Sequence, residues 1–345
     1  MTQPATHIWR LLKWGIILAR HRAMVGIERD ANTPPPIRRL ARWVALTGTK
    51  GEPDYSGAFQ AIGPAAIKLG QTLATRPDLV GENAARNLLA LQDSLPPVDF
   101  ALIRQEIEAS FGRPIADLFE SIEEAPIGAA SIAQVHRAIT TDGRRVAVKV
   151  LRPGIRETFT RDIDTYSWAA AHLEALGGEA ARLRPRAVVA NFERWTLAEL
   201  DLRREAASAS ELAEAMKGFE GYRVPAIDWD RTTSRVMTVE WIDGVKVSDM
   251  AALDAAGHDR ADIAHRLVLA FLTQAIAAGF FHADMHQGNL FIEADGTIAA
   301  IDFGIMGRIN RRARQWLAEI LYGLTTGNYR RVAEIHFEAQ YVPSY

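Results

Sequence analysis

The sequence predicts an α+β protein with two lobes and a helical extension on their N-terminal side. Three observations support this prediction: a strand-rich stretch over 115–151, a hairpin of two apolar strands over 289–301, and helical periodicity in the segments around them. The length of 345 residues corresponds to roughly two domains or one large bilobal unit. We therefore expect a bilobal fold whose regions are 1–50, 51–112, 113–241 and 242–345.

The composition is that of a globular chain with a real core. Hydrophobic residues make up 48% and charged residues 24%, which are ordinary shares for a folded domain. The net charge of −2 gives no indication of nucleic acid as a partner. The absence of cysteine excludes disulfides and thiolate metal sites and fits a reducing compartment. No run of 18 apolar residues indicates a membrane span, and basic residues interrupt the first apolar stretch, so no signal peptide is indicated.

The hairpin places an amide and an acid at one end. Asn289 begins an apolar strand over 289–292, and a turn reverses the chain into a second strand over 298–301. The second strand delivers Asp302 to the same end of the hairpin as Asn289. A further acid, Asp284, lies in the loop five residues before Asn289.

These three side chains are what metal-assisted phosphoryl transfer needs. Asn289 and Asp302 would hold a metal that bridges the phosphates, and Asp284 would orient or deprotonate the acceptor. The pattern resembles the catalytic loop and the metal-binding Asp-Phe-Gly of protein kinases. The alternative is a buried hairpin with a chance motif, which the order and spacing of the two motifs disfavour. The sequence therefore predicts a kinase-like core that uses ATP and Mg²⁺.

The strand-rich stretch predicts a nucleotide-binding loop. A strand, a turn of small residues and a second strand are followed by a third strand over 145–151, which carries Lys149. Small residues let backbone N–H groups approach phosphates, and a lysine on the adjacent strand can pair with them. Alanine stands where protein kinases have glycine, and the added Cβ atoms crowd the phosphate channel. We expect nucleotide contacts from Ile127, Gly128, Ala129, Ala130, Ser131, Ile132, Ala133, Gln134 and Val135.

A long helix is predicted over 186–217, and its carboxylates are candidate partners for Lys149. Asp201 and Glu205 share one face of this helix, whereas Glu199 points elsewhere. Charge-rich helix faces are usually solvated, but a kinase core requires one helical glutamate as the partner of the strand lysine.

A hinge and an apolar helix complete the predicted lobes. Residues 235–244 indicate a strand that runs into a turn, where a hinge between lobes would contact adenine through Glu240 and Ile242. A mostly apolar helix over 261–279 then leads to the catalytic loop.

The N-terminal region is basic and amphipathic. Residues 1–50 contain nine Lys/Arg and two Asp/Glu, a local charge of +7, and Trp9 and Trp14 lie beside basic residues in a helix over 8–29. Such a helix can lie in the interface of an anionic membrane. A helix packed on the domain body with a solvated basic face explains the pattern equally well. The proline-rich residues 32–36 predict a stiff linker after it.

The extension and the C-terminal segment are predicted to be helical. In the extension, Lys68 and Gln71 share a helix face, and Asp99 is a candidate cap for a helix over 99–111. After Gly304 only 41 residues remain, with a helix over 310–326 and a second from Tyr329. A kinase C-lobe normally needs more chain, so either the lobe is minimal or the chain is a fragment, and we expect a fragment with an incomplete C-lobe.

Together these motifs resemble the UbiB family of atypical kinases, called ADCK proteins in animals, over nearly the whole chain. The motifs are Lys68-Leu69-Gly70-Gln71 for the family's KxGQ, Gly128-Ala129-Ala130-Ser131 for its alanine-rich nucleotide loop, Glu199-Leu200-Asp201 for its ExD, and His282 to Asn289 for its HxDxHxxN loop. The resemblance implies that Lys149 pairs with Glu205. It also implies an extension that occludes the usual protein-substrate groove, formed by Lys68, Gln71, Glu199 and Asp201.

The resemblance further implies a role in ubiquinone biosynthesis at a membrane. The expected partners are an anionic membrane surface and the lipids or proteins of quinone biosynthesis, and the expected location is the cytoplasmic face of the inner membrane. Bacterial members typically carry hydrophobic spans C-terminal to this region, so we expect the chain to be a fragment that is peripheral on the membrane. Its last residues, 341–345, read as the middle of a loop.

Two other functional classes compete with this prediction. A small-molecule phosphotransferase of the aminoglycoside or choline kinase type shares a similar catalytic loop, but has no use for the KxGQ extension. A pseudokinase scaffold does not need the complete set of site residues. That set is present as Lys149, Asp284, Asn289 and Asp302.

Overall fold

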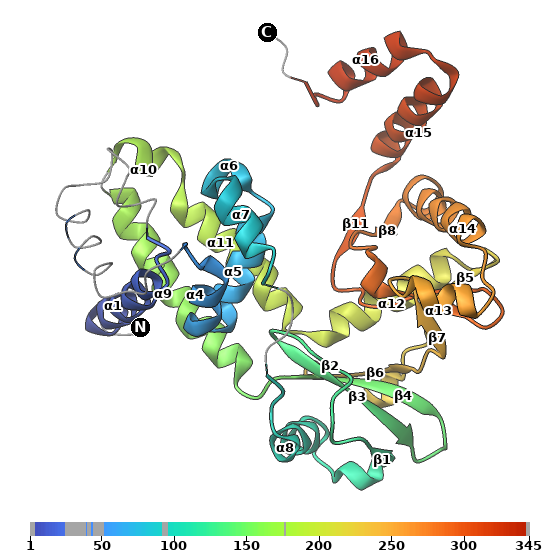
Figure 1. The fold of residues 1–345 in the computed structure, drawn as a ribbon, viewed down its shortest axis with the longest axis horizontal. Coiled ribbons are helices and arrows are strands. Elements are labelled where there is room, and N and C mark those ends of the chain that lie inside the picture. The colour runs from blue at the N-terminus through green and yellow to red at the C-terminus, as the bar shows by residue number, and fades with distance from the viewer. Residues whose placement is uncertain are drawn as a thin grey trace. The chain divides into compact units, whose positions relative to one another are not determined.

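The structure, a computed structural model, describes residues 4–24, 39, 43, 52–91, 96–175 and 177–342. Its chain divides into two compact units (Figure 1). The first unit comprises Met1–Arg113, Glu123–His136 and Lys149–Leu200, and the second comprises Pro114–Ile122, Arg137–Val148 and Asp201–Tyr345. This division cuts across the predicted N-lobe, because the helices inserted after Lys149 group with the extension.

The first unit is built mostly from helices. They are α1 (Pro4–Arg20), α4 (Tyr55–Ile62), α5 (Pro64–Ala74), α6 (Pro77–Val80), α7 (Glu82–Leu88), α8 (Phe100–Phe111), α9 (Ile155–Ala175), α10 (Gly178–Arg182) and α11 (Pro185–Glu199). The predicted cap of α8 is confirmed, because the Asp99 carboxylate accepts the N–H of Ala101 at 2.8 Å. Pro64 lies in the first turn of α5, where its missing N–H costs nothing.

Close packing around α5 requires a glycine. Ile67 on α5 forms an apolar cluster with Leu88 and Leu91. A Cβ atom on Gly70 would lie 2.4 Å from Leu91 Cδ1 and 2.7 Å from Phe59 Cδ1. The KxGQ glycine therefore lets α5 approach its neighbours closely.

A five-stranded sheet is built largely from the predicted strand-rich stretch. Its strands are β1 (Phe119–Ile122), β2 (Gly128–Ala129), β3 (Ala133–Thr140), β4 (Arg145–Leu151) and β6 (Val236–Glu240), in the order β1-β3-β4-β6 with β2 paired to β3. A short 3₁₀ turn, η1 (Ile115–Asp117), precedes β1. Along β4, Val146, Val148 and Val150 are all buried, which is the alternation expected of a strand with one face in a core.

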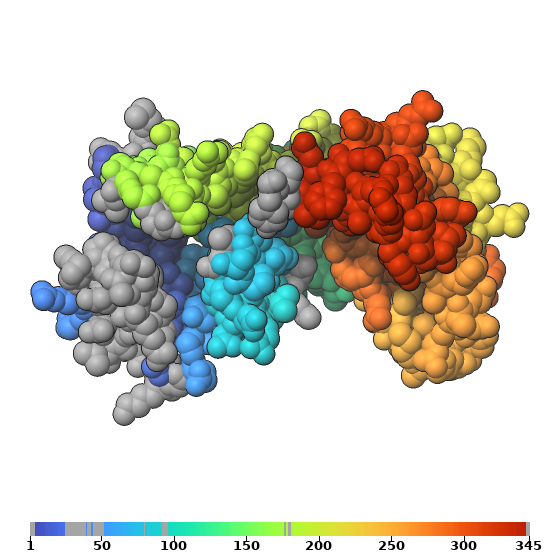
Figure 2. Space-filling model, turned by 90° about the horizontal axis from the view of Figure 1, so that it is seen from above, coloured from blue at the N-terminus to red at the C-terminus, as the bar shows by residue number. Residues whose placement is uncertain are grey.

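The second unit combines small sheets with helices. Its further elements are α12 (Leu202–Ala215), β5 (Tyr222–Arg223), η2 (Trp229–Arg231), β7 (Gly244–Lys246), α13 (Met250–Ala255), α14 (Arg260–Leu272), η3 (Thr273–Ala278), β8 (Phe280–His282), η4 (Gln287–Asn289), β9 (Leu290–Glu293), β10 (Ile298–Ala300), β11 (Met306–Arg308), α15 (Arg311–Thr326) and α16 (Tyr329–Glu338). One sheet has the order β5-β10-β9-β7, and β8 pairs with β11. The helices α15 and α16, both predicted, pack against each other, as the dark red atoms in Figure 2 show, and α15 also contacts η3.

The core of the second unit supports the catalytic hairpin. Leu290 and Ile292 of β9 and Ile298 and Ala300 of β10 are buried together with Phe303. Burying apolar side chains on both strands fixes the register of the hairpin, because a slip of one residue would move them to the opposite face.

The structure corrects the prediction of one helix over 186–217. The helix ends with α11, and α12 begins after Asp201. Asp201 has an extended backbone, with φ −124°, and its side chain accepts the N–H of Arg203. An aspartate in this position caps a new helix rather than continuing the old one, and Leu200 before it is buried.

The structure changes the bounds of two other predicted helices. The predicted N-terminal helix over 8–29 corresponds to α1, which ends at Arg20, and the linker 32–36 lies outside the described residues. The apolar helix predicted over 261–279 becomes α14 followed by the π-helical turn η3. Among the described residues, one segment, Arg260–Ala278, has the length and apolar composition of a membrane span. A core helix can meet the same criteria.

Candidate phosphotransfer site

The hairpin register brings the predicted metal ligands together. Ile298 lies opposite Ile292, and Ala300 opposite Leu290. One step further, the Ile301 N–H donates to the Asn289 carbonyl at 2.9 Å. Asn289 and Asp302 therefore sit at the same end of the β9–β10 hairpin, as the sequence predicts.

The imidazole of His282 ties the catalytic loop to this hairpin. Its Nδ1 accepts a hydrogen bond from the backbone N–H of Asp284 at 3.1 Å. Its Nε2 lies 3.1 Å from the Ile301 carbonyl oxygen. Because a carbonyl oxygen only accepts, Nε2 carries the proton and donates it to this bond. The ring is almost fully buried and packs 5.4 Å from the Phe303 ring. His282 thus connects the backbone of Asp284 to the residue that precedes Asp302.

A π-helical turn supports His282 from behind. Gln274 in η3 is fully buried. Its Oε1 accepts the His282 N–H at 3.0 Å. π-Helical turns are rare and occur often at functional sites. The sequence gives no signal for this contact, because its periodicity only predicts a helix there.

The Asn289 amide is held with its oxygen free for a metal. Nδ2 donates to the Asp284 carbonyl at 3.1 Å, so Oδ1 remains as the metal-binding atom. The Asp284 carboxylate is partly exposed, with the His286 ring 3.9 Å away. An exposed carboxylate beside a fixed metal ligand is suitably placed to orient an incoming acceptor.

Asp302 has the backbone of a strained residue. Its φ is +60°, in the left-handed region where aspartate and asparagine are among the few tolerated side chains. The Gly304 N–H points to Asp302 Oδ1 at 3.4 Å. Strained conformations of this kind are retained at functional sites when the surrounding structure holds them.

The donor set fits Mg²⁺. Asn289 and Asp302 offer one amide oxygen and one carboxylate, and the described residues contain no group of three or more His, Asp or Glu side chains that could hold a metal ion. Magnesium is usually bound by one or two protein oxygens together with phosphates and water, rather than by a complete protein cage. The residues therefore suit a metal that arrives with a nucleotide.

The predicted nucleotide loop is a tight turn in the first unit. The Ile127 N–H donates to the Val135 carbonyl, and the Ala130 N–H to the Ala133 carbonyl, both at 2.8 Å. Gly128 lies opposite Val135 in the β2–β3 pair. A Cβ atom on Gly128 would meet nothing within 4 Å, so the local packing does not require the glycine.

An arginine that the sequence did not indicate fastens this turn. Arg152 follows β4, and its N–H donates to the Ile132 carbonyl at 2.8 Å. Its guanidinium donates to the carbonyls of Ala130 at 2.9 Å and Pro96 at 3.0 Å. Burial lowers the pKa of Arg152 from its ordinary value. The turn is therefore anchored to the strand that carries Lys149 and to the start of the segment before α8.

Gln134 and His136 in β3 are buried and bonded to each other. The Gln134 amide accepts the Val98 N–H at 2.9 Å and lies 2.9 Å from His136 Nε2. His136 Nδ1 lies 2.8 Å from the Glu123 carbonyl. Burial lowers the pKa of His136, although the contact with that carbonyl opposes the shift. The Gln134 side chain is used here, so a nucleotide can meet this position only through its backbone.

Lys149 and Glu205 lie in different units. Lys149 is on β4, and the buried Glu205 is in the first turn of α12. The ion pair that the family resemblance implies between them stays a prediction.

The predicted hinge is fixed by an arginine. Glu240 ends β6, and its carboxylate accepts the Ala226 N–H at 3.0 Å and a bond from Arg223 at 2.9 Å. Arg223 also donates two bonds to Glu293 at the end of β9, at 2.6 and 2.7 Å. The hydrogen bond to Glu293 raises the pKa of Arg223. Arg223 therefore links the hinge to the strand that begins after Asn289, while Ile242 follows two residues later.

Within the extension, Lys68 on α5 pairs with Glu199 on α11. The distance from Nζ to Oε2 is 2.6 Å, and each side chain is 24% exposed. Gln71, on the same helix face as Lys68, donates to the Leu91 carbonyl at 3.2 Å. Asp201 caps α12 and pairs with Arg203 at 2.7 Å. The KxGQ and ExD motifs thus meet through their charged first residues.

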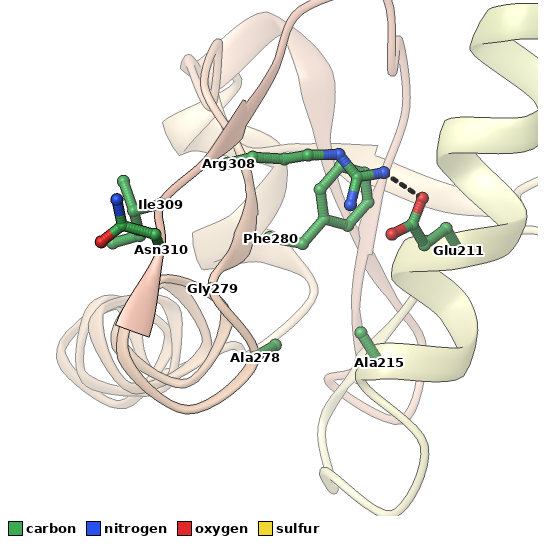
Figure 3. A pocket seen from close by; sticks show the side chains of 8 residues that line it. All are labelled: Glu211, Ala215, Ala278, Gly279, Phe280, Arg308, Ile309 and Asn310. Atoms are coloured by element: carbon green, nitrogen blue, oxygen red, sulfur yellow. Dashed lines mark hydrogen bonds and ion pairs between the residues drawn. The ribbon is translucent and has the colours of Figure 1, made fainter. Parts of the chain in front are cut away.

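A pocket of about 570 Å³ lies on the second unit beside β8 and β11 (Figure 3). Arg308 crosses it, stacks over the Phe280 ring at 4.3 Å and forms an ion pair with Glu211 of α12. None of the predicted site residues lines this pocket. The charged side chains that line it, Arg308 and Glu211, pair with each other. We therefore do not include this pocket in the candidate site.

These features define a kinase-like protein: the hairpin with Asp284, Asn289 and Asp302, the strand that carries Lys149, and the turn of small residues. A family model described as the ABC1 atypical kinase-like domain matches residues 90–336. This chain belongs to the ABC1 family of atypical kinases.

Its relatives include proteins named "Probable protein kinase UbiB". The chain is 40% identical to that of Marinobacter nauticus over 290 residues, which are 83% of this chain and 53% of the relative. It is 40% identical to that of Xanthomonas euvesicatoria pv. vesicatoria over 298 residues, which are 83% of this chain and 54% of the relative. The chain thus spans about half the length of the curated relatives that it matches.

A solved structure shares the fold. The complex of Rv3197 with erythromycin from Mycobacterium tuberculosis superposes with a TM-score of 0.60 and 28% sequence identity. The match covers 80% of this chain and 69% of that one. The comparison supports the kinase-like architecture of the chain.

Proposed function

We propose that this chain binds ATP with Mg²⁺ and transfers or hydrolyses the terminal phosphate, as a UbiB-type atypical kinase or ATPase. The observation that carries the proposal is the hairpin register, in which the bond from Ile301 to Asn289 puts Asn289 and Asp302 at one end. When bound, Mg²⁺ neutralises charge on the phosphate oxygens. Lys149 pairs with the phosphates, Asp284 orients the acceptor, and His282 holds the Asp284 backbone in place.

The biological role that we propose is support of ubiquinone or another prenyl-quinone synthesis. Its basis is the 40% identity to relatives named as UbiB kinases. The proposed location is the cytoplasmic face of the inner membrane, with an anionic lipid surface and the lipids or proteins of quinone synthesis as partners.

A small-molecule phosphotransferase is the second candidate. The ion pair between Lys68 and Glu199, at 2.6 Å, favours the UbiB-type function instead. This pair joins α5 to α11, and a kinase for soluble antibiotics or choline has no use for such a charged clamp in an added helical layer.

Thermal shift with Mg-ATP tests the nucleotide site. Asp302→Asn removes the charge of one metal ligand and keeps a side chain that tolerates positive φ. Asp295→Asn is the matched control, because it makes the same change in the β9–β10 turn, away from the predicted metal. A ligand at 100 times its Kd stabilises a protein by about 2.7 kcal/mol. We expect that stabilisation in the wild type and in Asp295→Asn, and its loss in Asp302→Asn.

Two further measurements separate the candidates. Lys149→Ala is expected to weaken stabilisation by Mg-ATP, and unchanged stabilisation in that variant or in Asp302→Asn would remove the role assigned to the residue. Phosphate release is then measured with anionic vesicles that carry a ubiquinone-precursor mimic, and separately with choline and an aminoglycoside. Stimulation by the vesicles supports the UbiB-type role, and stoichiometric phosphorylation of choline or the aminoglycoside contradicts it.

A further inference from the structure

One face of the helix α1 packs on the first unit through both apolar and polar side chains. His7 and Trp14 are buried. His7 Nδ1 lies 3.1 Å from Thr165 Oγ1 of α9, and Arg10 donates to the same hydroxyl at 2.6 Å and to the Arg161 carbonyl at 2.8 Å. These contacts confirm that α1 packs on the domain body.

The other side of α1 carries an exposed apolar stripe. We define the α1 stripe as Ile8, Trp9, Leu12 and Ile16, which are 48%, 66%, 55% and 44% exposed. Successive residues of a helix are about 100° apart, so these four side chains fall within an arc of about 100°. The centre of that arc lies on the side of the helix opposite His7 and Trp14. A helix that is packed on one face and exposes a continuous apolar arc on the other presents a second contact surface.

A basic edge borders the stripe. The exposed Lys13 and Arg20 fall about 20–40° beyond Trp9 on the helical wheel, and the first fifty residues carry a net charge of +7. Lysine and arginine next to an apolar face reach outward to bind phosphate head groups while their stems lie on the apolar surface. Tryptophan is enriched at the same depth of a bilayer, where its ring meets both lipid and water.

We propose that the α1 stripe inserts into the surface of an anionic phospholipid bilayer, with Lys13 and Arg20 binding the head groups. The inference rests on the membrane location proposed above and identifies the residues responsible. An apolar arc with charged residues along one edge is typical of helices that lie in the plane of the membrane interface. A second protein surface would have to be both apolar and acidic to match it, whereas an anionic bilayer supplies both properties everywhere. Because the opposite face of α1 is fastened to α9, insertion orients the first unit as a whole.

Vesicle co-sedimentation of the full chain tests the stripe. The stripe variant is Trp9→Ser with Leu12→Ser. The control is Trp195→Ser with Val188→Ser, which removes a tryptophan and an aliphatic residue that are more than half exposed on α11 of the same unit. With phosphatidylcholine vesicles that contain phosphatidylglycerol, we expect binding of the stripe variant to be at least about tenfold weaker than that of the wild type. The control is expected to bind like the wild type.

The charge contribution is measured separately. Lys13→Gln with Arg20→Gln is expected to reduce the preference for phosphatidylglycerol vesicles over pure phosphatidylcholine by about fivefold for each residue, and added salt should reduce the wild-type preference in the same way. Equal binding by the stripe and control variants overturns the proposal. A wild-type dimer in sedimentation velocity that only the stripe variant loses, with unchanged vesicle binding, also overturns it in favour of self-association.

Stabilisation by Mg-ATP is recorded on the same samples. It depends on Asp302 and Lys149 rather than on α1, so the kinase assignment and the lipid assignment can fail independently. Retained nucleotide binding with equal vesicle binding by all variants rejects the lipid proposal alone.

Discussion

Replacing Arg223 with methionine should destabilise the second unit by about 2–3 kcal/mol. The guanidinium donates two bonds to Glu293, whose side chain is 18% exposed, and one bond to Glu240, which is 42% exposed. A hydrogen bond to a charged group is worth about 1.5–3 kcal/mol when it is well protected, and an exposed ion pair about 0–1 kcal/mol. We therefore assign about 2 kcal/mol to the partly buried bidentate contact with Glu293 and about 0.5 kcal/mol to the contact with Glu240.

Urea unfolding followed by tryptophan fluorescence measures this loss. The matched control is Arg76→Met, because Arg76 also forms two bonds to one carboxylate, that of Asp78, but both side chains are more than half exposed. The control should change the free energy of unfolding by less than about 0.5 kcal/mol. If Arg223→Met costs no more than the control, the Arg223 contacts do not hold the strands together and the reasoning is wrong.

The same variant separates fixation of the hinge from general stability. The carboxylate of Glu240 keeps its bond to the Ala226 N–H when Arg223 is removed, but loses its link to β9. Because the predicted hinge contacts adenine, we expect Arg223→Met to bind Mg-ATP more weakly and Mg-tripolyphosphate as the wild type does. An equal loss for both ligands would mean that Arg223 supports the whole unit rather than the hinge.

Three further predictions concern the first unit. Gly70→Ala should lower the free energy of unfolding by about 1–3 kcal/mol, because the added Cβ would lie 2.4 Å from Leu91 Cδ1. The control Gly15→Ala in α1 has open space around the added Cβ and should raise the free energy of unfolding by about 0.5–1 kcal/mol. Equal effects of the two variants in urea unfolding would contradict the packing argument. Lys68→Ala should alter ATP hydrolysis without unfolding the chain, and it should lower the free energy of unfolding by about 1 kcal/mol because the partly buried Glu199 loses its partner. The double variant with Glu199→Gln should lose less stability. Hydrolysis by Lys68→Ala at the wild-type rate would show that the pair only holds the helices together. Burial lowers the pKa of His136 below the ordinary 6.5, so the unfolded chain binds the proton first, and the stability present above about pH 6.5 should fall as pH drops towards the folded-state pKa. His136→Gln should flatten the decline of the free energy of unfolding between pH 7.5 and 5.5. The control His265→Gln, at an exposed histidine, should leave that decline unchanged. Identical slopes of stability against pH in the two variants would refute the role assigned to His136.

The sequence predicted the elements whose chemistry is local. The hairpin that joins Asn289 to Asp302 was predictable because apolar strands, a turn and the spacing between them determine its register. The cap of α8 was predictable for the same reason, since Asp99 bonds to a backbone group two residues away.

Contacts between distant segments were not predictable in this way. Arg152 anchors a turn 22 residues before it, and Arg223 bonds to a carboxylate 70 residues after it. Such contacts depend on how the strands are placed in space, and an arginine leaves no periodic signal that indicates its partner. The break between α11 and α12 was missed because helical periodicity continues through it. The cap at Asp201 is a local hydrogen bond to the Arg203 N–H, and it does not change that periodicity.

The π-helical turn η3 makes this part of the chain intolerant of length changes. It holds one more residue per turn than an α-helix, and this extra residue sets the direction in which Gln274 points at His282. Deleting any one residue of 275–278 would leave a continuous helix but rotate everything before the deletion, Gln274 included, by about 100°. The Gln274 side chain would then be turned away from the catalytic loop. Substitutions on the outer side of α14 should therefore be tolerated in evolution, whereas insertions and deletions between Gln274 and Gly279 should be selected against.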